Sequence, residues 1–113
     1  MVRTFESGAT RDDDDTKVDF PGFLSPLVIK RYGEYMLSHQ RQSDGTLRAS
    51  GNWKKGIPMD AYLSSAWRHL LDWWLLQEGH EGREDIEAAL CALIFNASGA
   101  LHELLKGKTD GRA

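Results

Sequence analysis

Ser65, His69 and Asp72 follow one another at spacings of four and three residues, which places their side chains in one column of an α-helix. Arg68 stands beside them, one turn before Asp72, so the column gathers a base, an acid and a fixed cation. Such groups bind phosphates and transfer protons. The alternative is a surface ion pair between Arg68 and Asp72, which would contribute little to stability, with His69 as an ordinary helix histidine. Spacing alone favours this alternative.

A second polar group depends on how the next helix packs. If the two helices form an antiparallel hairpin about a turn near residue 80, Glu87 faces Asp72 and could join it and His69. Asn96 would face Ser65 further in, and an amide in apolar surroundings needs a hydrogen-bond partner. We therefore expect Asn96 either to cross-link the helices or to contact a ligand.

Two further clusters carry donors that suit an anion, one near the N-terminus and one in a turn-rich loop. Their members are Thr10, Arg11 and Lys17 in the first, and Asn52, Trp53, Lys54 and Lys55 in the second. Arginine offers a planar fork to a phosphate, lysine a point charge, and tryptophan a face on which a base can stack. The alternative is a solvated loop whose Trp53 only packs against the core.

Turn-forming residues divide these 113 residues, enough for one domain, into an arm, three helices and a tail. Ser25 and Pro26 form a helix start, with an N-cap hydroxyl and a proline at the first helical position. Gly79 ends the second helix, and acidic residues suit the start of the third. We expect an all-α domain over residues 25–106. Within this domain we expect helices over 25–40, 58–79 and 83–105 and a loop over 41–57. An extended arm over 1–24 precedes the domain, and a flexible tail over 107–113 follows it.

The apolar surfaces of the second and third helices exceed what one short chain can cover. In the second helix the stripe lies away from Ser64, Arg68 and Asp72, and comprises Leu63, Ala66, Trp67, Leu70, Leu71 and Trp74. The third helix is apolar nearly all round over 86–101, and Ala92 and Gly99 would let helices approach closely. We therefore expect three-helix domains packed as a helical-bundle homo-oligomer, held by the third helix. The alternative is that the arm wraps the third helix within one chain.

Charge and composition exclude several classes of function. The formal net charge of −3 and the pI near 5.7 give no basic field for duplex DNA or RNA, although a small anion needs only a local cluster. The chain has no phosphate-binding glycine loop, zinc-ligand spacing or nucleophile motif. The N-terminus lacks the apolar core of a signal peptide, the longest apolar runs fall short of a membrane span, and Cys91 suits a buried reduced thiol. We expect a cytoplasmic protein with no membrane partner.

Several motifs, taken in order and spacing, resemble a known family. They are Val2-Arg3-Thr4-Phe5 with Gly8-Ala9-Thr10-Arg11-Asp12, Phe23-Leu24-Ser25-Pro26, Asn52-Trp53-Lys54-Lys55-Gly56-Ile57-Pro58, Trp67-Arg68-His69 and Leu90-Cys91-Ala92-Leu93-Ile94-Phe95-Asn96. Together they resemble small bacteriophage and prophage proteins related to the dATP/dGTP diphosphohydrolase N-terminal domain family, which is similar to MazG-type all-α nucleotide pyrophosphohydrolases. The resemblance covers nearly the whole chain. It implies a helical oligomer in the cytoplasm of a bacterial host, with a nucleotide site between subunits.

The resemblance implies two functions that remain open at this point. In the first, the protein sequesters a small cyclic or purine nucleotide without a cofactor, as a phage could do against a host immune signalling nucleotide. The expected binding residues are Thr10, Arg11, Lys17, Asn52, Trp53, Lys54, Arg68, His69 and Asn96. In the second, the protein is a dNTP pyrophosphohydrolase that needs Mg²⁺ or Mn²⁺. Its metal ligands would be Asp72, Asp85 and Glu87, and its catalytic residues His69, Asp72 and Glu87.

The acidic residues decide between these two functions. MazG-type enzymes pair acidic motifs across helices, whereas here His69 and Asp72 enclose two leucines where an acidic pair would stand. Because Mg²⁺ prefers oxygen ligands in a near-octahedral array, this thinner set favours sequestration. A third interpretation is an oligomeric adaptor, which would have no pocket.

Overall fold

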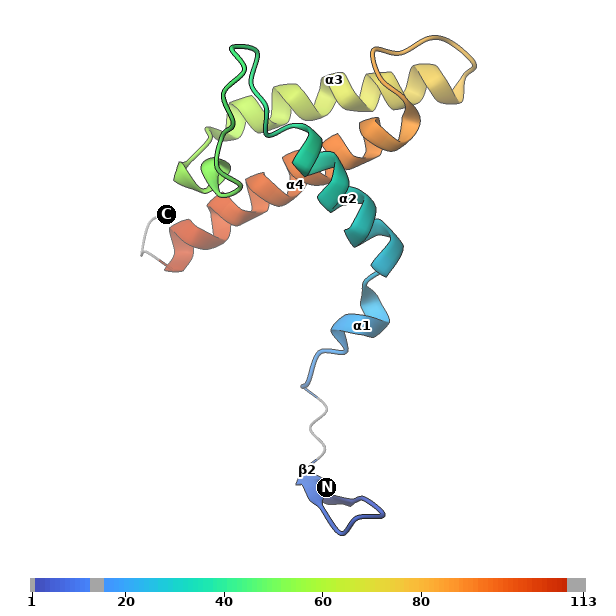
Figure 1. Cartoon of the computed structure of the whole chain (residues 1–113), viewed down its shortest axis with the longest axis vertical. Helices are drawn as coiled ribbons and strands as arrows, with labels where there is room; N and C mark the ends of the chain where they lie inside the picture. The colour runs from blue at the N-terminus through green and yellow to red at the C-terminus, as the bar shows by residue number, and fades with distance from the viewer. Residues whose placement is uncertain (1, 13–15, 110–113) are drawn as a thin grey trace.

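The computed structural model describes residues 2–12 and 16–109, and most of these residues are helical, as predicted. The elements in chain order are β1 (Val2–Thr4), β2 (Thr10–Asp12), α1 (Phe20–Phe23), α2 (Pro26–Ser38), the 3₁₀ helix η1 (Asn52–Lys55), α3 (Met59–Gln77) and α4 (Ile86–Thr109). Helices α3 and α4 lie side by side as an antiparallel hairpin, and α2 crosses α4 (Figure 1). The arm extends from the start of α2 away from the layer formed by α3 and α4, and it ends in the N-terminal hairpin (Figure 1).

Helices α2 and α3 have the ends that their capping residues predict. The Ser25 hydroxyl accepts a hydrogen bond from the amide of Val28 at 3.3 Å, and Pro26 is the first helical residue. Helix α3 ends at Gln77, two residues before Gly79, whose φ of +85° is the left-handed conformation that commonly follows a helix. These local signals place both helices within a few residues of the expected bounds.

Helix α4 begins later and ends later than expected. Asp85 lies before its first turn, where its carboxylate accepts a hydrogen bond from the amide of Ala88 at 2.8 Å. Arg83 and Glu84 stay outside the helix because their side chains bind residues of α3. At the other end the helix continues through Gly107 to Thr109, into the range expected as a tail, and residues 110–113 lie outside the described part.

The N-terminal arm has regular structure that the sequence pattern did not predict. Strands β1 and β2 pair antiparallel with Arg3 opposite Arg11, and Gly8 supplies the positive φ of the turn between them. The short helix α1 is capped by Asp19, which accepts from the amide of Gly22 at 3.1 Å. The arm stands away from the helical layer, so the alternative in which it wraps the third helix is wrong (Figure 1).

The core is small and lies where α2 and α3 meet α4. Cys91 and Ala92 of α4 are buried against Tyr35 of α2. Further along, Tyr62 of α3 packs against Gly99, where an added Cβ would lie 2.4 Å from the tyrosine ring. The glycine therefore allows the close approach of the two helices that was expected of it.

The predicted apolar stripe of the second helix lies on the opposite face from the one expected. The side of α3 that faces α4 carries Tyr62, His69 and the buried Asp72, whereas Trp67 and Trp74 are each 64% exposed. The alternative of a surface ion pair between Arg68 and Asp72 is therefore wrong, because Asp72 is buried and Arg68 contacts Ser64. The burial of Asp72 is possible because a neighbouring arginine neutralises it, a contact that helical periodicity does not encode.

Helix α4 also corrects the expectation about membrane spans. Among the described residues, the stretch 86–108 contains an 18-residue window with a mean hydropathy of 1.5 and is long and apolar enough to cross a membrane by length and composition. A mostly buried core helix of a soluble protein passes the same test, whereas 28% of this window is buried within the chain. In this chain α4 is the central helix, packed along α3 and crossed by α2.

Candidate functional site

A cavity of about 540 Å³ opens between the end of α2, the loop that follows it, and the facing sides of α3 and α4. Its apolar wall consists of Tyr35, Met36, Trp53, Ile57 and Phe95. Its polar wall includes His39, Arg41, Arg48, Asn52, His69 and Asn96. No carboxylate is among the described residues that line it. The cavity therefore combines aromatic surface with cationic and amide donors.

A tight hairpin in the 41–57 loop positions the two arginines of the cavity. At its tip the Asp44 carboxylate accepts hydrogen bonds from the amide of Thr46 at 2.9 Å and from its hydroxyl at 2.6 Å, which lowers the pKa of Asp44. Gly45 takes a φ of +87°, so the chain reverses there. Arg41 on the outgoing side and Arg48 on the returning side thereby come to the same wall of the cavity.

The two arginines differ in how they are held. The guanidinium of Arg41 donates to the carbonyl of Gly45 at 2.8 Å, so the tip of the hairpin already holds it. Arg48 is anchored through its backbone amide, which donates to the carbonyl of Gln40 at 2.9 Å. Its side chain has no ion pair within the ranges 2–12 and 16–109. Arg48 is therefore ready to pair with an anion in the cavity.

Trp53 is fixed against α4 while it lines the cavity. Its ring stands edge-on to the rings of His102 at 4.8 Å and Phe95 at 6.4 Å, measured between ring centroids. Lys54 lies 5.5 Å from the Trp53 ring, and its carbonyl accepts from Lys106 at 3.4 Å. The packing role and the ligand-facing role proposed for this tryptophan are therefore compatible.

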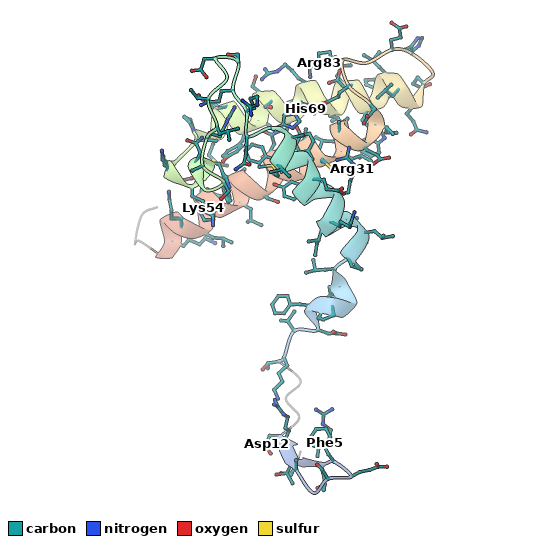
Figure 2. All side chains as sticks on the ribbon, viewed as in Figure 1. Phe5, Asp12, Arg31, Lys54, His69 and Arg83 are labelled. Carbon is teal, nitrogen blue, oxygen red and sulfur yellow. The ribbon has the colours of Figure 1, made fainter. Side chains whose placement is uncertain are left out.

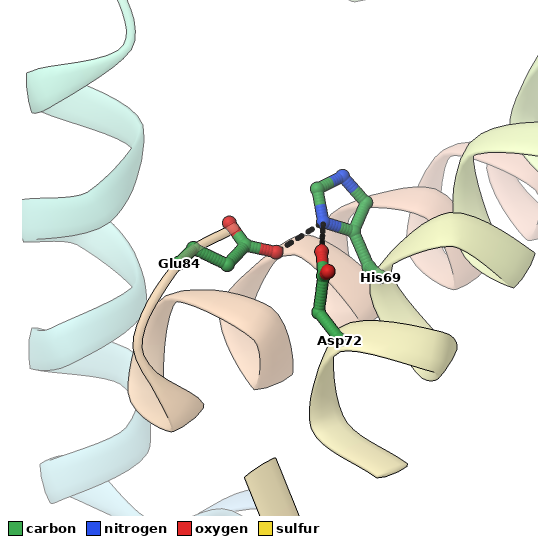
Figure 3. A group of neighbouring side chains, drawn as sticks. All are labelled: His69, Asp72 and Glu84. Atoms are coloured by element: carbon green, nitrogen blue, oxygen red, sulfur yellow. Dashed lines mark hydrogen bonds and ion pairs between the residues drawn. The ribbon is translucent and has the colours of Figure 1, made fainter. Parts of the chain in front are cut away.

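His69 is oriented by carboxylates from two elements, as Figure 3 shows. Its Nδ1 is hydrogen-bonded to the Glu84 carboxylate, and Oδ2 of Asp72 lies 4.0 Å from the same nitrogen. The other ring nitrogen, Nε2, points away from both acids (Figure 3). Because the His69 ring is part of the cavity wall, Nε2 is the atom that can meet a ligand there.

Asp72 is already saturated by Arg83. The Arg83 guanidinium donates to Oδ2 at 2.7 and 3.0 Å and to Oδ1 at 3.2 Å, and the Arg83 amide donates to Oδ1 at 3.3 Å. The hydrogen bonds from Arg83 hold the pKa of Asp72 below its usual range, although burial opposes this shift. The carboxylate is thus an anion with its oxygens engaged.

The three acids expected to bind a metal have separate partners. Asp72 binds Arg83, Asp85 caps α4, and Glu87 pairs with Arg31 of α2 at 2.7 Å. Among the described residues the potential metal ligands that do converge belong to His69, Asp72 and Glu84, with all ligand atoms within 4.8 Å. This set fits Mg²⁺ poorly, because the Asp72 oxygens accept from a guanidinium and the third ligand is an imidazole.

The structure brings together four of the nine residues expected to bind a nucleotide. Asn52, Trp53, His69 and Asn96 line the cavity. The Asn96 amide donates to the carbonyl of Ala92 in its own helix at 2.8 Å, so it does not cross-link helices through this bond.

The other five expected residues lie outside the cavity. Lys54 adjoins Trp53, and Arg68 is exposed and donates to Ser64 at 2.8 Å rather than pairing with Asp72. Thr10, Arg11 and Lys17 belong to the arm, whose hairpin end with Phe5 and Asp12 is far from His69 in Figure 2.

Sequence reasoning missed His39, Arg41, Arg48 and Glu84. A signal for the two arginines was present, because Asp44-Gly45 is a hairpin turn that brings the flanking segments together. In the structure Arg41 lies opposite Leu47, and Arg48 lies opposite Gln40. Glu84 had no such signal, since its contact with His69 depends on how the α3–α4 loop folds back.

Comparisons with known proteins add no relative. No protein-family model matches the chain, and searches of curated proteins and of solved structures likewise find no match. The resemblance to the dATP/dGTP diphosphohydrolase N-terminal domain family therefore remains an expectation from sequence motifs.

Proposed function

We propose that this protein binds a small nucleotide in the cavity between α2, the 41–57 loop, α3 and α4, and holds it without cleaving it. The observation that carries the proposal is the lining of the cavity, where arginines and histidines stand beside aromatic rings and no carboxylate intervenes among the described lining residues. Such a wall attracts an anion and offers stacking surface to a base. The volume of about 540 Å³ is within the usual range for small-ligand sites.

Each part of the ligand has a matching part of the cavity. Arg48 pairs with a phosphate oxygen, with Arg41 in the same polar wall. His69 also belongs to this wall, and its Nε2 donates to the phosphate when both ring nitrogens carry a proton. The base stacks on Trp53, while the amide of Asn52 supplies hydrogen bonds to its edge. The sequence resemblance points to the same class of ligand, and sequestration of a signalling nucleotide during phage infection is the role it suggests.

Metal-dependent pyrophosphohydrolysis is the second candidate function. The convergence of His69, Asp72 and Glu84 next to the cavity favours it, because three such groups within 4.8 Å could hold a divalent cation. The pairing of Asp72 with Arg83 argues against it. Binding without cleavage therefore remains our proposal.

Incubation with a mixed nucleotide pool tests both functions. Mass spectrometry of the retained fraction after denaturation, and of the solution, separates intact bound ligand from monophosphate and pyrophosphate products. The retained nucleotide is then titrated calorimetrically against Arg48→Ala and against the matched control Arg68→Ala, whose guanidinium lies outside the cavity. We expect Arg48→Ala to weaken binding about tenfold or more, as for loss of a charged hydrogen bond, and Arg68→Ala to bind as wild type. Equal affinities of wild type and Arg48→Ala would show that the nucleotide does not bind in this cavity.

We also propose that the working form is a homo-oligomer. The accessible surface of one chain is 9087 Å², whereas a compact monomer of 12.7 kDa exposes about 6,200 Å². The radius of gyration is 19.3 Å, compared with about 13 Å for a compact domain of this length. The surplus of about 2,900 Å² per chain, or about 5,800 Å² for two chains, is at the upper end of the total area that obligate interfaces bury.

A further inference from the structure

The apolar stripe on α3 has no cover within its own chain. Leu63, Trp67, Leu70, Leu71 and Trp74 are between 36% and 64% exposed. They lie within about 100° of one another around the helix and span about 16 Å along it. Contiguous apolar surface with two tryptophans marks an association site rather than a solvated face.

The junction of the arm and α2, residues 20–29, is equally apolar and equally uncovered. Phe23 and Leu27 are each 79% exposed, and Phe20, Leu24 and Ile29 are all more than half exposed. Three of the five residues lining a hollow of about 340 Å³ are Phe20, Leu24 and Ile29, and the other two are prolines. This hollow has room for a large apolar side chain and contains no charged group.

We infer that two copies of this chain exchange arms, so that residues 20–29 of each copy lie on the α3 stripe of the other. This inference rests on the proposed homo-oligomer and is independent of the nucleotide. The arm stands away from the body, so its apolar residues cannot reach the α3 stripe of the same chain in this conformation (Figure 1). A second copy supplies both missing partners at once, because each chain carries one uncovered arm and one uncovered stripe.

The exchanged arm also explains which helix forms the interface. The third helix was expected to hold the oligomer. Ala89 and Ala92 of α4 are buried within one chain, whereas Leu101, Leu104 and Leu105 near its C-terminal end are each more than half exposed. A charge at Ala92 would therefore disrupt the core of the monomer and would not report on association. The large apolar side chains that remain exposed on the hairpin include Trp67 and Trp74 of α3. A large aromatic side chain entering an apolar hollow is the usual anchor of a protein interface.

The mass of the full-length chain in solution tests the first step. Light scattering and native mass spectrometry at micromolar concentration should give twice the chain mass. A monomer would overturn the arm exchange and the homo-oligomer together, but it would leave the nucleotide proposal to be judged by its own titration.

Complementation between two variants tests which surfaces meet. We expect Phe23→Asp, in the arm, and Trp67→Asp, in the stripe, each to raise the dimer dissociation constant at least about 30-fold, as loss of an interface anchor does. An equimolar mixture of the two should regain dimer as a heterodimer. In that heterodimer the intact arm of the Trp67→Asp chain lies on the intact stripe of the Phe23→Asp chain. Lys17→Asp in the arm and Arg68→Asp outside the stripe are controls that introduce the same aspartate with a larger change in charge, and both are expected to stay dimeric.

Two results of the complementation experiment would overturn the arm exchange. A dimeric Phe23→Asp chain would show that the arm is not in the interface, and the inference would be wrong even if Trp67→Asp were monomeric. Two monomeric variants that fail to form a heterodimer would show that arm and stripe do not contact each other, which also overturns it. Circular dichroism of each variant verifies the helix content, and Phe23→Ser with Trp67→Ser replaces the pair if an aspartate variant does not fold.

Discussion

Arg83 binds both carboxylate oxygens of Asp72 across the α3–α4 hairpin, with the shortest contact at 2.7 Å from Nη2 to Oδ2. Asp72 is only 3% exposed, so this pair is what allows an acid on the inner face of α3. The same loop carries Glu84 to His69. The α3–α4 loop thus orients the polar wall of the cavity, although it supplies none of the residues that line it.

The Asp72–Arg83 pair predicts a loss of stability in acid. Arg83 lowers the pKa of Asp72 in the folded chain, while an unfolded aspartate titrates near pH 3.9. The pair therefore stabilises the fold fully above about pH 4, and the contribution disappears as the pH falls through the lowered folded pKa. At fixed protein concentration, the free energy of unfolding from urea titrations should fall between about pH 7 and about pH 3 more in wild type than in Asp72→Asn.

The comparison with Asp72→Asn isolates this one carboxyl group. Asp44 also has a lowered pKa, but both proteins retain it, so its contribution cancels in the difference. If the two proteins lose stability in parallel over this range, Asp72 is not held as an anion by Arg83.

Gly99 should be intolerant of a side chain. An added Cβ would meet the Tyr62 ring at 2.4 Å, so Gly99→Ala must displace the ring or separate α3 from α4. We expect a loss of about 1–3 kcal/mol, as for overpacking of a core. Thermal and chemical unfolding followed by circular dichroism measure it.

Gly33 is the matched control for Gly99, since it is also helical and an added Cβ there would meet nothing within 4 Å. Alanine at this position should stabilise α2 by up to about 1 kcal/mol through its helix propensity. A loss of stability in Gly99→Ala together with a gain in Gly33→Ala would support the close approach of α3 and α4. A gain of stability in both variants would contradict it.

Cys91 should react slowly while the chain is folded. Burial raises the pKa of its thiol, although the charge of Arg31 opposes this shift, and the side chain is buried against α2. Because the thiolate is the reactive form, a disulfide reagent at neutral pH should label Cys91 slowly in buffer and quickly in denaturant. Labelling at equal rates would show that α2 does not cover this part of α4.

Local signals in the sequence were sufficient for the helices themselves. Ser25 and Pro26 fix the start of α2, and Gly79 marks the end of α3, because capping depends on residues within one turn. The start of α4 was misplaced because Arg83 and Glu84 are held by α3, a tertiary contact. The hairpin in the arm was missed because its strands are three residues each, too short to show alternation.

The orientation of α3 could not be predicted from its apolar pattern. Periodicity identifies the most apolar face, and burial of that face within the same chain was the natural assumption. In the structure the inner face instead carries Tyr62, which fits against Gly99, and Asp72, which pairs with Arg83. The most apolar face is then left exposed, and periodicity cannot distinguish a stripe that is buried within the chain from one that is not.

The last prediction concerns metal ions and separates binding from hydrolysis. A pyrophosphohydrolase must neutralise charge that develops on the phosphates, for which carboxylate-bound Mg²⁺ or Mn²⁺ is the usual means. Here Asp72, Asp85 and Glu87 each have another partner, while Arg48 and His69 offer positive charge or hydrogen-bond donors directly in the cavity. We therefore expect EDTA to change nucleotide affinity by no more than about threefold, or roughly 0.65 kcal/mol, in calorimetric titrations. Loss of all binding in EDTA, restored by Mn²⁺ and accompanied by release of pyrophosphate, would contradict sequestration and establish the hydrolase instead.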